Sequence, residues 1–250
     1  MRETWNIRFG TAGTSDSFAA QGYKSSLDVP EYTAKMGLNA FEYQCGRGVR
    51  LGLDKAARMA ALAAQRDILF SVHAPYYISM SSLEEDKRLN SIQYLLQSAA
   101  VCRALGGRRI IFHSGSCGKQ SREAALEKAL DTMRRAVAAL DEAGFEDLTL
   151  CPETMGKVGQ LGTLDEVLTL CSVDSRITPC IDFGHLTPAR WAASRPRRTM
   201  PPFWTAWPRC WAMTVPGSSM CTFPASSTRR AAKSATGPLP ILSSARSPSP

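Results

Sequence analysis

Three histidines and two carboxylates in this chain are of the types, and at the positions, that could bind a metal ion. The sequence holds three His, at His73, His113 and His185, and each follows or closes a short apolar run. Glu153 follows a further run, and Asp182 ends another. A lone histidine at a strand end is most often structural, but five such groups at equivalent positions favour a shared site. Imidazole and carboxylate donors suit Zn²⁺, with Mn²⁺ or iron as alternatives, so we predict a metal centre formed by these residues.

Short β-like runs that alternate with helical segments must position these side chains. Apolar and β-branched residues mark six predicted strands. These are Ile7–Thr11, Ala40–Tyr43, Ile68–His73, Arg109–His113, Leu148–Pro152 and Pro179–Asp182.

The clearest predicted helix runs from Ser121 to Gly144. Its apolar residues recur at intervals of three and four, which places them on one helix face. They are Leu126, Leu130, Met133, Val137 and Leu140. Ser121 is expected to cap the start, and Gly144 to end the helix in a left-handed turn. A second long helix is predicted from about Leu83 to Leu105.

Repeated alternation of strand and helix predicts a parallel sheet with helices outside it. An open doubly wound sheet and a (β/α)₈ TIM barrel both have this pattern. No GxGxxG motif follows the first strand, which argues against a dinucleotide-binding sheet. Polar residues at the carboxyl ends of successive strands favour the barrel, where those ends converge on one mouth. Only six of the eight β/α units are visible, so we predict an incomplete barrel.

The net charge of +8 comes entirely from the last sixty residues. Residues 1–190 hold 22 basic and 22 acidic side chains, whereas residues 191–250 hold eight basic and none acidic. The second segment also holds ten of the 15 Pro, and its Pro and Ser leave no helix or strand period. We therefore divide the chain into a barrel domain, 1–190, and a basic Pro/Ser/Arg-rich tail, 191–250, expected to be disordered or frameshifted.

Cysteine use and hydropathy bear on the compartment. The eight Cys are scattered without a CxxC pair, which is typical of reduced thiols. No apolar run reaches membrane-spanning length, and the N-terminus lacks the apolar stretch of a signal peptide. We expect a cytoplasmic protein that is a monomer and has no membrane partner.

Four motifs in chain order resemble those of the endonuclease IV family. They are His73-Ala-Pro-Tyr76, Phe112-His113-Ser-Gly-Ser116, Cys151-Pro-Glu153-Thr and Cys180-Ile-Asp182-Phe-Gly-His185. This is the zinc-dependent apurinic/apyrimidinic endonuclease family 2, within the xylose-isomerase-like TIM-barrel superfamily. The resemblance covers roughly residues 5–190, and it is more specific to the superfamily than to the nuclease branch.

The resemblance implies a cluster of up to three Zn²⁺ ions. His73 and His113 are similar to ligands of the first ion, and Glu153 to the catalytic carboxylate that bridges the first and second. Asp182 is similar to a ligand of the second ion, and His185 to a ligand of the third.

Candidate DNA-binding residues are one tyrosine from the resemblance and two arginines from a loop. Tyr76 matches a position that contacts DNA at the abasic site, although an aromatic that merely packs at the barrel mouth would look the same. Arg47 and Arg50, in the loop after the second strand, could bind phosphates.

The implied activity is hydrolysis of the phosphodiester on the 5′ side of abasic sites in DNA. A metal-dependent sugar isomerase or epimerase on the same barrel, acting on a sugar or sugar phosphate, is the alternative. A third reading, less favoured, is non-catalytic nucleic-acid binding through the basic tail.

Residues 191–250 do not continue the family pattern. Family members go on to a His-Val-His-Phe strand and then Glu-Lys-Arg-His. Read one nucleotide earlier, the codons of Met220–Phe223 and Ala232–Thr236 permit both motifs, in the right order. We infer a frameshift near Arg190, and we expect the chain as printed to be nearly inactive.

Overall fold

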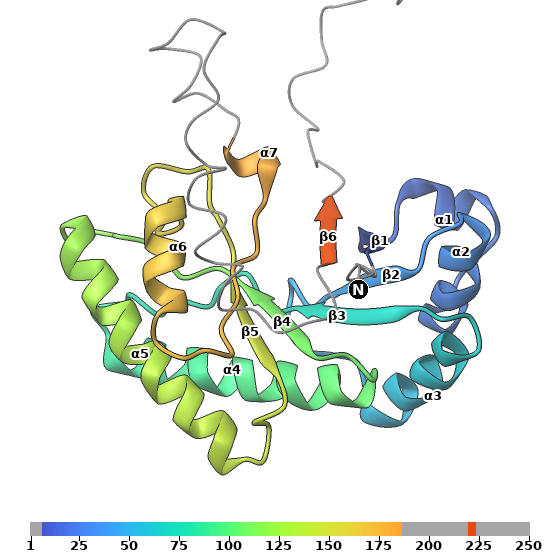
Figure 1. Ribbon diagram of the computed structural model, residues 1–250, viewed down its shortest axis with the longest axis horizontal. Helices are drawn as coiled ribbons and strands as arrows, with labels where there is room; N and C mark the ends of the chain where they lie inside the picture. Colours follow the sequence, from blue (N-terminus) through green and yellow to red (C-terminus); the bar gives the residue numbers. More distant parts are fainter. Residues whose placement is uncertain (1–6, 187–219, 224–250) are drawn as a thin grey trace, which may run out of the picture.

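Parallel strands joined by helices form the part of the chain that the computed structural model describes, residues 7–186 and 220–223 (Figure 1). The strands are β1 Arg8–Ala12, β2 Ala40–Gln44, β3 Leu69–His73, β4 Arg109–Phe112, β5 Thr149–Pro152 and β6 Met220–Phe223. Their order across the sheet is β5-β4-β3-β2-β1-β6. The helices are α1 Asp16–Ala20, α2 Val29–Lys35, α3 Leu53–Ala64, α4 Glu85–Ala104, α5 Arg122–Glu142, α6 Leu164–Cys171 and α7 Phe183–Leu186, with a 3₁₀ turn at Ser26–Asp28.

Helices α2 to α6 lie around the outer side of the curved sheet (Figure 1). Each packs against the next, from α2 through α3, α4 and α5 to α6. None of the helices in the described ranges is long and apolar enough to cross a membrane. Sequential parallel pairing from β1 to β5 with helices outside is the wall of a barrel, as predicted.

The hydrophobic core fills the space between the strands and this ring of helices. Alternate residues of a strand point to opposite faces, so one set faces the helices. That set is apolar and buried: Phe41, Phe70, Val72, Ile110, Phe112 and Leu150. It meets helix residues such as Met59, Leu95 and Met133, all fully buried. The other set of strand residues faces the inside of the curve, where the polar groups lie.

Helix α5 confirms the predicted start and end. The Ser121 side chain accepts a hydrogen bond from the Ala124 N–H, and Gly144 has φ +73°. The buried face, however, is centred on small residues: Ala125, Ala129, Thr132, Met133, Ala136 and Leu140. The predicted residues Leu126, Leu130 and Val137 flank this face and are only partly buried. The small side chains of this face let α5 pack closely against α4.

The sixth predicted strand, Pro179–Asp182, is wrong as a full strand. Cys180 forms an isolated parallel bridge with Glu153, and Asp182 is followed directly by α7. Pro179 has no N–H, and the Asp182 N–H donates to the Thr154 hydroxyl rather than to a strand. The segment still lies beside β5, because the N–H groups of Thr178 and Cys180 donate to carbonyls of that strand.

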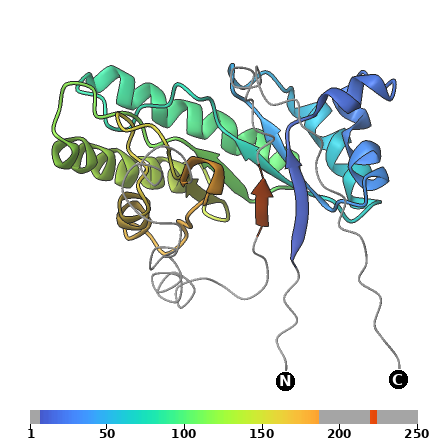
Figure 2. The same ribbon diagram turned by 90° about the horizontal axis from the view of Figure 1, so that it is seen from above.

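Strand β6 lies in the tail, where the sequence has no strand period. It pairs with β1 in parallel, with Arg8 opposite Met220 and Thr11 opposite Phe223 (Figure 2). The unpaired backbone groups along the edge of β1 can hydrogen-bond to any extended segment, whatever its side chains. Met220–Phe223 is the segment that the earlier reading frame would turn into His-Val-His-Phe. The rest of 191–250, and the question of a frameshift, lie outside the described residues.

Arg122, at the start of α5, makes hydrogen bonds to the loop before α6 and to Glu166; we call this group the arginine clamp. Arg122 bonds both Glu166 oxygens and donates to the carbonyls of Val158 and Gln160, each at 2.7 Å. Glu166 also accepts the N–H groups of Gly162 and Thr163. Burial alone would raise the pKa of Glu166, but these hydrogen bonds, led by that from Arg122, hold it below 4.5. The clamp is partly buried, since the Glu166 side chain is 10% exposed.

We expect Arg122→Met to lower the free energy of unfolding by about 2–3 kcal/mol at pH 7, because Glu166 loses its charged partner. A carboxyl whose pKa is lowered on folding stabilises above its unfolded pKa, about 4.3, and loses that effect as pH falls through the folded value. The wild-type chain should therefore lose stability below about pH 4, and the variant should lose less. Urea unfolding at several pH values measures both effects. Exposed Arg134→Met, on the same helix, is the control, and an equal loss in both variants would contradict the prediction.

Candidate metal centre

The register of the sheet places the predicted ligands on its inner face. His73 pairs with Ile111, which lies two residues before His113. Ile111 in turn pairs with Cys151, two residues before Glu153. Residues paired in a parallel sheet, and residues two apart in a strand, share a face. The same alternation that buries the apolar residues against the helices therefore brings His73, His113 and Glu153 together at the carboxyl ends of β3, β4 and β5.

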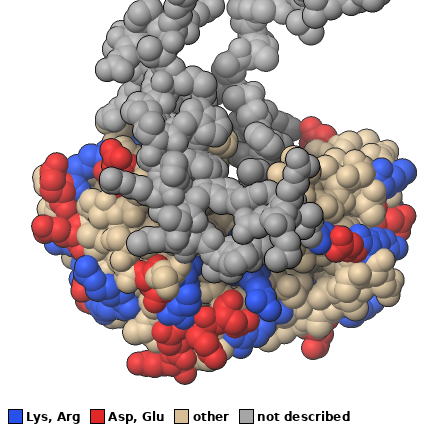
Figure 3. Space-filling view, viewed as in Figure 1, with Lys and Arg blue, Asp and Glu red and all other residues tan. Residues whose placement is uncertain are grey.

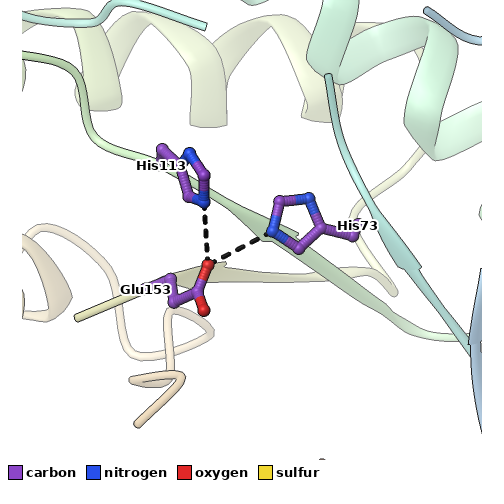
Figure 4. A group of neighbouring side chains, drawn as sticks. All are labelled: His73, His113 and Glu153. Carbon is purple, nitrogen blue, oxygen red and sulfur yellow. Dashed lines mark hydrogen bonds and ion pairs between the residues drawn. The ribbon is translucent and has the colours of Figure 1, made fainter. Parts of the chain in front are cut away.

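Two imidazoles converge on one carboxylate oxygen in the first group, His73, His113 and Glu153 (Figure 4). Nε2 of His73 lies 3.2 Å and Nε2 of His113 lies 3.0 Å from Oε2 of Glu153. The two rings meet edge to face, with centroids 5.0 Å apart. Nδ1 of His73 lies 2.8 Å from the carbonyl of its neighbour Ala74 and donates to it, which leaves Nε2 facing Glu153. The ring is thus oriented with its ligand atom toward Glu153.

A second group of Glu153, Asp182 and His185 shares the same carboxylate. His185 Nδ1 lies 3.1 Å from Oδ2 of Asp182 and 3.7 Å from Oε1 of Glu153. The same nitrogen lies 2.9 Å from the Thr154 carbonyl, so one edge of the His185 ring faces this carbonyl and both carboxylates. The resemblance assigned His185 to a third ion, whereas here it lies with Asp182.

Burial and charge act against each other at Glu153. Burial alone would raise its pKa, but hydrogen bonds from His113 and His73 outweigh that effect and hold the pKa at about 2. For His73 the signs are reversed: burial would lower its pKa, but the carboxylates of Glu153 and Glu42 raise it. Glu153 is therefore anionic at any physiological pH. Protons compete with a metal for His73 from a higher pH than for an ordinary histidine.

The donor chemistry of both groups suits divalent metal ions. In each group the three ligand atoms lie within 4.8 Å of one another. Two imidazoles with one carboxylate is a common set of three protein ligands for catalytic Zn²⁺, with a fourth position for water. The second group, with two carboxylates and one imidazole, suits Zn²⁺ or Mn²⁺. Glu153 has one oxygen toward each group, so it would bridge two ions.

The predicted DNA-binding residues lie around the same end of the sheet. Tyr76 is 61% exposed, and its N–H points to the carbonyl of Gly46, so it lies beside the loop that carries Arg47 and Arg50. Both arginines are exposed. Sequence reasoning missed Tyr77, whose ring lies 5.5 Å from that of Tyr76 and 4.8 Å from that of Tyr94. Adjacent tyrosines after a strand end were the available signal.

Two buried polar residues near the ligands were also missed. Glu42 is 3% exposed, lies on the inner face of β2, and accepts a hydrogen bond from Gln44 at 2.8 Å. Thr154 is fully buried directly after Glu153. Its position next to a predicted ligand was a signal, but a threonine at a strand end usually only satisfies backbone groups.

The surface of the described part carries both signs of charge. On the face seen in Figure 3, basic and acidic side chains are interspersed. Residues 1–190 have no net charge, so any attraction for an anionic substrate would come from bound cations and from Arg47 and Arg50.

Comparison with known proteins gives relatives of two kinds. An uncharacterised protein of Methanocaldococcus jannaschii is 35% identical over 178 residues, which cover 71% of this chain and 62% of that protein. A probable endonuclease 4 of Mycoplasma pneumoniae is 31% identical over 119 residues, which cover 46% of this chain and 40% of that protein. The match thus spans less than two thirds of either relative.

Comparison with solved structures finds the same fold. The crystal structure of a D-psicose 3-epimerase in the presence of D-fructose superposes with a TM-score of 0.61 at 11% identity, covering 86% of this chain and 84% of that one. At this identity the likeness is one of fold. The family model described as xylose isomerase-like TIM barrel matches residues 30–203, well over half of the chain. Together with the parallel wall of strands and its mouth of His and carboxylate groups, this match shows that the chain belongs to the xylose isomerase-like TIM barrel family.

Proposed function

We propose that this chain is a metal-dependent phosphodiesterase of the endonuclease IV type, which hydrolyses DNA on the 5′ side of abasic sites. The observation that carries the proposal is the sharing of Glu153 between two three-residue groups, which gives places for at least two adjacent ions. The probable endonuclease 4 of Mycoplasma pneumoniae, 31% identical over 119 residues, supports the same class of substrate.

The residues would divide the work as follows. His73, His113 and Glu153 would hold one ion, and Glu153, Asp182 and His185 the other. Divalent ions bound there would lower the pKa of water enough to give hydroxide near neutral pH and would neutralise charge on the phosphate in the transition state. Arg47 and Arg50 would hold flanking phosphates, and the exposed ring of Tyr76 would pack against the sugar or bases beside the lesion.

A sugar isomerase or epimerase remains the second class for this barrel. Such chemistry uses carboxylates and histidine around one divalent ion to move a proton on an open-chain sugar. Five donors in two groups exceed what one ion needs, which is why we place the nuclease first. Non-catalytic binding of nucleic acid through residues 191–250 would need none of the five.

Metal counting and strand cleavage together test the proposal. We expect the purified chain, dialysed against Zn²⁺, to bind at least two ions by elemental analysis. A duplex with one abasic site should be nicked on the 5′ side of the lesion, faintly by the chain as printed, while an intact duplex is not. One bound ion, with exchange of substrate protons of a ketose into solvent, would instead favour the epimerase. DNA binding that persists without metal and is lost on deleting 191–250 would favour the basic arm.

A further inference from the structure

Thr154 makes hydrogen bonds to Asp182 and His185, two of the three residues of the second group. Its hydroxyl accepts the N–H of Asp182 at 2.8 Å and donates to the carbonyl of the same residue at 3.3 Å. Its carbonyl accepts from His185 Nδ1 at 2.9 Å, and its own N–H donates to the carbonyl of Cys180 at 3.0 Å. Thr154 therefore makes hydrogen bonds to both ligands that the second group does not share with the first.

The segment that carries Asp182 and His185 continues as a helical turn rather than as a strand. Beyond Cys180 it leaves the sheet, and α7 is a single turn whose start is fixed by the His185 N–H donating to Oδ1 of Asp182. The first group differs, because its ligands lie on or directly after strands β3, β4 and β5, which are paired along the sheet. The geometry of the second group therefore involves a side-chain hydroxyl, whereas that of the first follows from strand pairing.

The backbone of His185 also lies very close to Gly156, in the loop that follows Glu153. A Cβ at Gly156 would lie 2.7 Å from the backbone carbonyl oxygen of His185, closer than atoms can pack. Gly159, in the same loop, has open space around it. The absence of a side chain at Gly156 is therefore what allows α7 to lie against the loop that follows Glu153.

We propose that Thr154 is the positioning residue of the second metal group, and that it sets the affinity of that group independently of the first. The proposal rests on the proposed two-ion function. The hydroxyl fixes the backbone on both sides of Asp182 and thereby the direction of its carboxylate, and Gly156 lets His185 reach the same place. Partners of metal ligands typically change metal affinity by about 10–100-fold when they are removed.

Zn²⁺ titration of the full chain, followed by calorimetry and elemental analysis, tests the role of the hydroxyl. Thr154→Val keeps the shape but leaves the buried Asp182 N–H without its acceptor. We expect the second ion to bind about 10–100-fold more weakly, and the first within about twofold of wild type. Thr154→Ser keeps the hydroxyl and should bind both ions nearly as wild type does. Thr154→Ala, which cannot clash, should repeat the valine result, and thermal melting reports whether each variant folds.

Substitutions at Gly156 and Gly159 give a second, independent test with a matched control. Gly156→Ala should push α7 away and weaken the second ion selectively, whereas Gly159→Ala should bind both ions like wild type.

Three results would overturn the positioning role. They are unchanged binding of both ions in Thr154→Val and Thr154→Ala, an equal loss of both ions in those variants, and failure of Thr154→Ser to restore the second. A wild-type chain that binds one ion only would instead overturn the proposed function. Failure of the Thr154 proposal and failure of the proposed function therefore give different results.

Discussion

Replacing Glu153 with glutamine is expected to weaken the binding of both metal ions at once. The two oxygens of Glu153 face different groups, with Oε2 near His73 and His113 and Oε1 near His185. An amide of the same size has no negative charge and one acceptor oxygen, so it cannot bridge two cations. We expect each ion to bind at least about 100-fold more weakly, beyond the range for partners that only orient a ligand. Elemental analysis after dialysis measures the loss.

Single-group variants are the controls for this experiment. Asp182→Asn removes a ligand of the second group alone, and His113→Asn a ligand of the first alone. Each should lose one ion and keep the other. If Glu153→Gln loses only one ion, the carboxylate is not shared, and the two-ion centre is wrong. Circular dichroism of all three variants checks that the loss of metal does not follow from unfolding.

Restoring the earlier reading frame after about codon 190 is expected to give the largest gain of activity. The chain as printed provides the five donors described above, whereas family members have further His and Glu residues in the part that follows. Groups that act as a unit are strongly non-additive, so regaining them together should raise the rate of abasic-site cleavage by about 1000-fold or more. The measurement is single-turnover nicking of an abasic duplex by both chains, with Zn²⁺ supplied to each.

The coding DNA decides the premise of this prediction. An open frame one nucleotide earlier should encode His-Val-His-Phe at Met220–Phe223 and Glu-Lys-Arg-His at Ala232–Thr236. Its absence would end the frameshift hypothesis. A restored chain carrying Glu153→Gln should be as inactive as the printed one, which ties any gain to the metal centre.

The strands and long helices could be predicted from the sequence because local chemistry determines them. The run Arg109–Phe112, whose last three residues are apolar, favours a buried strand, and Ser121 and Gly144 mark the ends of α5 by hydrogen bonding and a left-handed turn. The prediction of a strand at Pro179–Asp182 was wrong for a reason that lies outside the segment itself. Whether a short apolar run pairs as a strand depends on competing partners for its N–H groups, and at Asp182 the competitor, Thr154, is 28 residues away.

By itself the sequence determined which residues could bind metal and at which end of the sheet they lie. The donor types at His73, His113, Glu153, Asp182 and His185 are chemical facts, and parallel strands bring their carboxyl ends together in any barrel. Only the tertiary structure decided how the five divide: Glu153 is shared, and His185 lies with Asp182. That division depends on backbone hydrogen bonds and side-chain directions fixed by packing between segments far apart in the chain, such as those around Thr154, and no local pattern encodes them.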